Sequence, residues 1–155
     1  MNFDERFAEL NLQLPPAPKP NGLYRPVLVV GNLAYVSGHA PLRVDGSRIT
    51  GKVGADLDLE AGKLAARHSG LAIVSTLKNE FGSLNRIRRV VKLLGLVNCS
   101  DNFQQHPAVI NGCSELLADV FGPEFGVGAR SAAGANSLPG GIAVEIEAIF
   151  EVNQR

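Results

Sequence analysis

Apolar residues at helical spacing predict a long helix over residues 58–81. Asp56 or Asp58 can cap its first turn, and Gly82 can end it. A second long helix is predicted over residues 107–121, ended by Gly122. The predicted buried stripe of the first helix consists of Leu57, Ala61, Leu64, His68, Leu71 and Val74. The stripe of the second consists of Val109, Cys113, Leu116, Leu117 and Val120.

Runs of apolar and β-branched residues outside these helices predict strands. They cover residues 23–30, 33–37, 48–53, 86–97, 129–137 and 142–152. Gly31-Asn32 is a tight hairpin signal between the first two runs. The last two runs are predicted to fold back on each other as a closing hairpin around Pro139. A short amphipathic helix is predicted at residues 4–12, and the proline-rich residues 14–22 are predicted to form an extended connector.

This order of elements does not alternate strictly between strand and helix, which predicts the α+β class. Two long helices are expected on one face of a mainly antiparallel or mixed sheet. The 155 residues are expected to form one domain over residues 15–155, preceded by a helical extension over residues 1–14.

Composition narrows the classes of function. The formal net charge is zero, which argues against a dedicated electrostatic nucleic-acid binder. No apolar run reaches 18 residues, and the N-terminus lacks a basic start followed by an apolar core, so a cytoplasmic protein without a membrane partner is expected. Cys99 and Cys113 have no CxxC spacing and are expected to be reduced thiols.

Several candidate groups give weak signals. His39, His68 and His106 share no metal-ligand spacing, and nucleotide-binding glycine motifs are absent, so no metal and no cofactor are expected. Ser37 and His39 lie close together at the end of a predicted strand, but no G-x-S-x-G elbow surrounds them, so covalent serine catalysis is not expected. A basic cluster is interpreted as a solvated strand edge, with an RNA-contacting patch as the alternative: Arg86, Arg88, Arg89 and Lys92.

Arg130 and Glu145 form the strongest candidate pair. Arg130 begins a small, neutral run, and Glu145 alternates with apolar residues in the last strand. A guanidinium can hold a carboxylate through two parallel hydrogen bonds, and a nearby glutamate can position water or take its proton. The predicted closing hairpin would place both residues on paired strands. A structural ion pair remains an equally open interpretation.

Four stretches of the sequence carry a resemblance to a known family. They are "NGLYRPVLVVGNLAYVSGHAPL", "GKVGADLDLEAGKLAAR", "GSLNRIRRVVKLLGLVNCSDNFQQHPAVINGCSELLADVFG" and "GARSAAGANSLPGGIAVEIEAI". Together and in this order they resemble the Rid family of reactive intermediate deaminases, also called YjgF-like and often labelled L-PSP endoribonucleases. The chain is most similar to a longer bacterial branch, with an extra N-terminal helix and an insertion before Arg130.

The resemblance implies a chorismate-mutase-like fold assembled as a homotrimer with clefts between subunits. It implies a hydrolase, a deaminase of the 2-iminobutanoate/2-iminopropanoate type, that converts enamines and imines such as 2-aminoacrylate to 2-keto acids and ammonia. By this resemblance Arg130 holds the substrate carboxylate and Glu145 orients the attacking water. The remaining implied substrate-binding residues are Tyr24, Ser37, Asn111, Ser131 and Ala132.

One position departs from the family pattern. The best-known branch has cysteine two residues after the arginine, where this chain has Ala132. A role played by main-chain groups would survive this change, whereas thiol chemistry would not. Two other functions stay open: a non-catalytic module that binds small carboxylates, and an RNA-cleaving or translation-inhibiting protein. The zero net charge and the lack of a base–nucleophile pair argue against the second.

Overall fold

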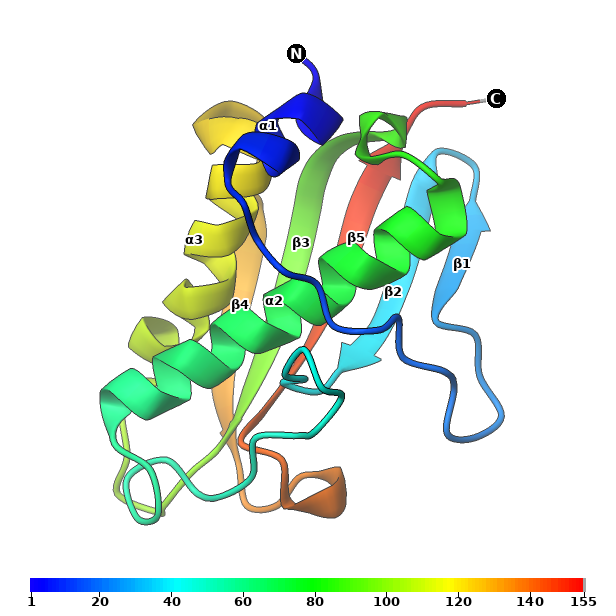
Figure 1. Ribbon diagram of the computed structural model, residues 1–155. Coiled ribbons are helices and arrows are strands. Elements are labelled where there is room, and N and C mark those ends of the chain that lie inside the picture. Colours follow the sequence, from blue (N-terminus) through cyan, green and yellow to red (C-terminus); the bar gives the residue numbers. More distant parts are fainter. Residues whose placement is uncertain (155) are drawn as a thin grey trace.

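The computed structural model describes residues 1–154, which contain three helices and a five-stranded mixed sheet (Figure 1). The helices are α1 (Phe3–Glu9), α2 (Leu59–Phe81) and α3 (His106–Phe125). The strands are β1 (Val27–Val30), β2 (Leu33–His39), β3 (Ile87–Asn98), β4 (Ala129–Ala135) and β5 (Val144–Val152). Single 3₁₀ turns occupy Leu84–Arg86 and Pro139–Gly141. The predicted α+β class is confirmed.

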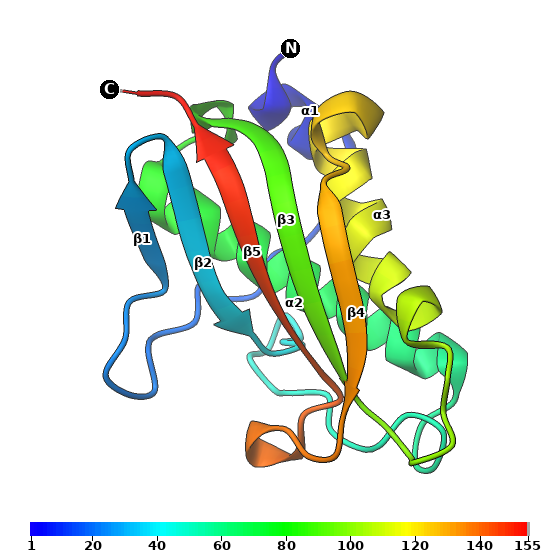
Figure 2. The same cartoon turned by 180° about the vertical axis from the view of Figure 1, so that it is seen from behind.

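The strands lie in the order β1-β2-β5-β3-β4. β3 and β4 are parallel, and the other neighbouring pairs are antiparallel. Both long helices cover one face of the sheet, as predicted, and the opposite face is the one seen in front of them in Figure 2. We call these the helix face and the open face.

The predicted closing hairpin is wrong, because β3 lies between β4 and β5. α3 connects β3 to β4, and a helical crossover of this kind places the second strand parallel to the first. The segment after β4 must then pass the end of β3 before β5 begins. β4 consequently forms one edge of the sheet, and it carries Arg130 there.

Strict alternation along β5 assigns its side chains to the two faces. The residues directed to the helix face are all buried: Val144, Ile146, Ala148, Phe150 and Val152. Glu145 is half-buried and Glu147 is exposed, and both point to the open face. Because one residue of slip would exchange the two sets, the burial of the apolar set fixes where these carboxylates lie.

The ends of α2 are confirmed, but its predicted stripe is confirmed only in part: Leu71 and Val74 are buried. Asp58 caps the first turn by accepting from the Ala61 amide, and Gly82 ends the helix in the left-handed conformation. Leu64, however, is 53% exposed. The buried face is made mainly of small residues, among them Ala65, Ala66, Ser69 and Gly70. These small side chains allow α2 to pack closely against α3 and the sheet. The spacing of the larger apolar residues in the sequence does not show which face of the helix does so.

The predicted stripe of α3 is confirmed, since all five of its residues are buried. Gly122 breaks the helical dihedral angles with a φ of 79°, and a last turn continues to Phe125. Residues 48–53 make only isolated β-bridges, so the strand predicted there is wrong.

The N-terminal segment packs on the helix layer. Phe3 and Phe7 of α1 are buried, and the Phe3 ring packs edge-on against Phe121 of α3. Residues 12–20 have no regular structure, as predicted, and run across α2 (Figure 1), where the Ser75 hydroxyl donates to the carbonyl of Pro15. The connector then reaches the end of the sheet where the main cavity opens.

Candidate functional site

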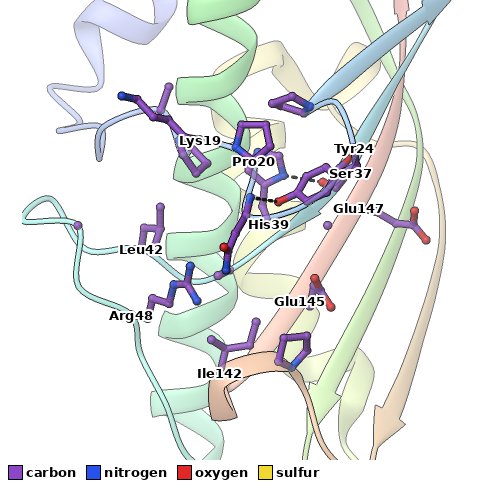
Figure 3. A pocket seen from close by; sticks show the side chains of 18 of the residues that line it. Lys19, Pro20, Tyr24, Ser37, His39, Leu42, Arg48, Ile142, Glu145 and Glu147 are labelled. Atoms are coloured by element: carbon purple, nitrogen blue, oxygen red, sulfur yellow. Dashed lines mark hydrogen bonds between the residues drawn. The ribbon is translucent and has the colours of Figure 1, made fainter.

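A cleft of about 670 Å³ opens where the proline-rich connector passes the end of β2 and the start of β5 (Figure 3). Tyr24, Ser37 and Glu145 all line it, so the structure brings together three of the predicted site residues. The remaining walls come from connector residues 16–21 and from the loop that follows β2. Segments far apart in sequence therefore build one cavity.

Glu145 is the acidic group of this cleft. Burial raises the pKa of its carboxyl, and the nearby charge of Glu147 raises it further. Within residues 1–154 the Glu145 side chain has no hydrogen-bond partner. Its carboxylate lies against the backbone of Gly38, where an added Cβ would be 2.6 Å from Oε1. A carboxyl group with a raised pKa and no partner is suited to accept a proton from bound water.

The end of β2 holds its polar side chains in place. The Ser37 hydroxyl donates to the carbonyl of Arg25 at 2.6 Å, and the Tyr24 hydroxyl accepts from the Asn21 amide at 3.2 Å. His39 is only 3% exposed, and burial lowers its pKa. Its Nε2 lies 2.7 Å from the hydroxyl of Thr76, away from the Ser37 hydroxyl. A serine–histidine nucleophile is therefore excluded, because a register shift between Val36 and His39 turns the His39 side chain to the helix face.

Arg130 is held at the β4 edge by neutral partners. Its Nη1 donates to Asn111 Oδ1 at 2.6 Å and to Ser114 Oγ at 3.1 Å, both on α3. Within residues 1–154 no carboxylate lies within 4 Å of its guanidinium, and Nε and Nη2 have no protein acceptor. The structural ion pair considered from the sequence therefore does not form within one copy of the chain. The guanidinium is oriented, but its charge is not compensated.

The structure does not bring Arg130 and Glu145 together. Arg130 is paired with Leu93, which is buried on the helix face, whereas Glu145 is paired with Leu96 on the open face. The side chains thus leave opposite faces of the sheet, with β3 between their strands. The two residues of this pair cannot contact the same small molecule within one copy of the chain.

The residues after Arg130 also alternate between faces. Ser131 is exposed on the open side, and Ala132 packs partly against the core on the helix side.

Burial raises the pKa of the neighbouring Cys113 thiol to about 12, against the opposing effect of the Arg130 charge. That thiol is therefore neutral at physiological pH and is not a reactive nucleophile.

Two contacts of the site were missed in the sequence. Ser114 lies three residues after Asn111, a spacing that places both on the same side of a helix, so helical geometry could have identified it. Gly38 directly follows Ser37, but only the register between β2 and β5 shows that it lies against Glu145.

The other candidate groups do not gather into a site. Among residues 1–154, no three His, Cys, Asp or Glu side chains are placed to hold a metal ion. His68 Nδ1 meets the carbonyl of Leu42 at 3.1 Å. Arg86 and Arg89 of the basic cluster donate to backbone carbonyls, and Arg88 lies 3.8 Å from Glu151. These separate contacts fit the interpretation of a solvated strand edge.

Comparison with known proteins identifies the family. The family model described as "YjgF/chorismate_mutase-like, putative endoribonuclease" matches residues 4–139. The chain belongs to this family. It is also 41% identical over 144 residues to Protein TCP17 of Trypanosoma cruzi, a match that covers 93% of this chain and 90% of that protein. The resemblance inferred from the four sequence stretches is confirmed.

Solved structures of the family fall at two levels of similarity. The Atu1372 protein of Agrobacterium tumefaciens is 39% identical with a TM-score of 0.87, covering 97% of this chain and 94% of that one. A "putative endoribonuclease" of Shewanella oneidensis is 27% identical with a TM-score of 0.92, covering 98% and 100%. RidA of an Antarctic Psychrobacter is 26% identical with a TM-score of 0.61, covering 88% and 94%. In residues 1–154 no helix is both long and apolar enough to span a membrane.

Proposed function

We propose that this protein hydrolyses reactive enamine and imine intermediates, of the 2-aminoacrylate type, to 2-keto acids and ammonia without a cofactor. One observation carries the proposal: two uncompensated groups, the Arg130 guanidinium and the Glu145 carboxyl, leave opposite faces of one sheet. In a homotrimer, Arg130 of one copy can face the cleft that contains Glu145 of the next. The similarity to RidA of Psychrobacter supports this class of chemistry.

The reaction needs little from the protein, because an imine already has an electrophilic carbon. Arg130 would hold the α-carboxylate through its free N–H donors. Glu145 would accept a proton from a water molecule while its oxygen attacks the imine carbon. Starting from the protonated imine, this proton would return to the nitrogen of the tetrahedral intermediate, the C–N bond would break and ammonia would leave. The hydroxyl group would then release its proton to Glu145 and become the carbonyl. Water adds and ammonia departs, so no oxidant or reductant takes part.

The open face supports an assembly of several copies. Apolar side chains lie side by side on it and are exposed or only half-buried: Leu28, Tyr35, Leu94, Leu96 and Ile149. A sheet face of this kind is normally covered by another protein surface. Packing of copies through this face would bring the β4 edge of one copy close to the cleft of another.

The decisive experiment generates 2-aminoacrylate enzymatically and follows release of the keto acid with and without the protein. We expect faster release with the protein, and a fall in kcat/KM of at least about tenfold to a hundredfold for Arg130→Ala, because a charge-assisted contact is lost. Arg130→Lys should recover only part of the rate, since an ammonium lacks the planar fork of donors. Arg67→Ala, on α2 outside the cleft, is the matched control.

Thermal melting and oligomer mass are measured on the same samples. Full activity per site in an Arg130→Ala protein would contradict the assignment of this residue. Tight binding of 2-keto acids without turnover would instead indicate a non-catalytic binding module. Cleavage of RNA that depends on Glu145, with no effect on imines, would favour the ribonuclease alternative.

A further inference from the structure

Arg48 lies on the wall of the same cleft but was not among the predicted site residues. We infer that the cleft accepts 2-imino acids whose side chain ends in a second carboxylate, and that Arg48 binds this distal carboxylate. This inference rests on the proposed function, since it names the substrate class of that same site. It adds a specificity-determining residue that no family motif in the sequence indicates.

The loop that carries Arg48 is held firmly beside Glu145. The Ala143 amide donates to the carbonyl of Ile49 at 3.0 Å, and the Gly51 amide donates to the carbonyl of Gly141 at 3.0 Å. Both bonds lie just after Arg48 in the chain, and they join its loop to the segment that leads into β5. Because Glu145 follows Ala143 by two residues, the cation and the carboxyl group are fixed to one short stretch of backbone.

The Arg48 guanidinium is free to bind a ligand. Its Nη1 lies 3.6 Å from the position that a Cβ atom on Gly140 would take. Within residues 1–154 the Arg48 side chain has no hydrogen-bond or ion-pair partner. Its neighbour Arg43 behaves differently, because the Arg43 Nη1 donates to Ser47 Oγ and to the carbonyl of Arg48. An arginine with all its side-chain donors free can hold a carboxylate through two parallel hydrogen bonds.

The charges of the cleft are separated between two walls. Glu145 and Glu147 come from β5, whereas Arg48 and Lys19 come from the loop after β2 and from the connector. Figure 3 shows Arg48 and Glu145 on two sides of the space below Tyr24 and Ser37. An imine nitrogen, which is cationic when protonated, would lie by the acidic wall. A distal carboxylate would lie by the basic wall.

The size of the cleft favours a substrate longer than 2-aminoacrylate. Cavities of roughly 300–1,000 Å³ hold ligands of drug size, and this one measures about 670 Å³. An imine with three carbon atoms would fill only a small part of it. An imine with a four- or five-carbon dicarboxylate skeleton would extend from Glu145 toward Arg48.

The test compares equilibrium binding of 2-oxoglutarate and 2-oxobutanoate by calorimetry, because these keto acids differ in the distal carboxylate. For the unmodified protein we expect a Kd at least about tenfold lower for 2-oxoglutarate, which corresponds to about 1.4 kcal/mol. Arg48→Gln should bring the ratio of the two Kd values close to one, and Arg48→Lys should restore part of it. Arg67→Gln, on α2, should keep the ratio of the unmodified protein.

A parallel assay follows hydrolysis of 2-iminoglutarate and 2-iminobutanoate, formed in place by amino-acid oxidases. If the Kd ratio depends on Arg48 but neither imine is hydrolysed faster, dicarboxylate recognition stands and the proposed catalysis fails. If 2-iminobutanoate is hydrolysed but the Kd ratio is near one, or is unchanged in Arg48→Gln, the inference is overturned while the proposed function stands. Absence of binding by both keto acids at millimolar concentration also overturns it.

Discussion

Arg130 and Glu145 lie in contrasting environments: neutral partners orient the Arg130 side chain, whereas burial and a neighbouring carboxylate disfavour the charged form of Glu145. Arg130 is oriented by two neutral side chains of α3, and an arginine stays protonated at any physiological pH. Glu145 has no hydrogen-bond partner within residues 1–154, and burial together with Glu147 raises its pKa. The first environment keeps a fixed positive charge available for an anion. The second favours a group that exchanges protons.

Under the proposed function, this contrast would let the sheet divide one site between two copies of the chain. A single copy presents the Arg130 guanidinium at the β4 edge on the helix face, and the Glu145 carboxyl group in the cleft, directed to the open face. Each half is built by its own packing, so each can be changed without removing the other. Substitutions in one half or in both halves test how independent, and how complementary, the two halves are.

The largest expected effect is complementation between two inactive variants. Arg130→Ala and Glu145→Gln should each lose most of the imine hydrolysis. When equal amounts are co-refolded into random cyclic trimers, roughly a quarter of the interfaces should combine an intact arginine with an intact glutamate. Activity should therefore return to roughly a quarter of the unmodified value. Each variant refolded alone is the control, and no recovery in the mixture would mean that the two residues do not share a site.

A smaller effect is expected from Gly38→Ala. Its φ is not in the left-handed region, so alanine fits the backbone, but the new Cβ would lie 2.6 Å from Glu145 Oε1. Because the glutamate side chain can move aside, we expect nearly unchanged thermal stability and a fall in kcat/KM of about tenfold. The same substitution in a Glu145→Gln background should cause little further loss. Equal losses in both backgrounds would show that Gly38 acts through another group.

Ala132→Cys should change kcat/KM by less than tenfold. Ala132 faces the helix side and packs partly against the core, so its side chain lies outside the wall that Glu145 forms. A site that uses only main-chain groups at this position would not depend on a thiol. Steady-state kinetics of the two proteins check this, and a gain of a hundredfold or more would assign the cysteine of related chains a direct part in the reaction.

The smallest expected effect concerns stability and pH. Because the folded-state pKa of Glu145 is raised, its ionised form destabilises the fold at pH values above that pKa, and this loss disappears as the pH falls and the group is protonated. Glu145→Gln should raise Tm at pH 8 by no more than about 4 °C, with a much smaller change near pH 4. Glu80→Gln, at the exposed end of α2, is the control. An equal rise at both pH values would contradict the pKa shift.

Local patterns predicted much of the fold correctly. Asp58 and Gly82 marked the ends of α2 because capping and left-handed termination depend on residues within one turn. The Gly31-Asn32 turn joined β1 to β2 for the same reason. The predicted α2 stripe failed at Leu64, because the position of a helix on a sheet depends on which small residues allow close approach. Close approach depends on the side chains of both the helix and the sheet, so the sequence of the helix alone does not predict it.

The chain by itself determined which side chains are available, and only the tertiary structure decided which of them meet. The residues around Arg130 and Glu145 indicated a cation and a proton acceptor before any fold was known. Their location on opposite faces depends on β3 entering between β4 and β5, a pairing between segments about 40 to 60 residues apart that no local pattern specifies. The same holds for Arg48 and Gly38. Their neighbours lie about 90 to 110 positions away, and backbone hydrogen bonds between distant segments bring them beside Glu145.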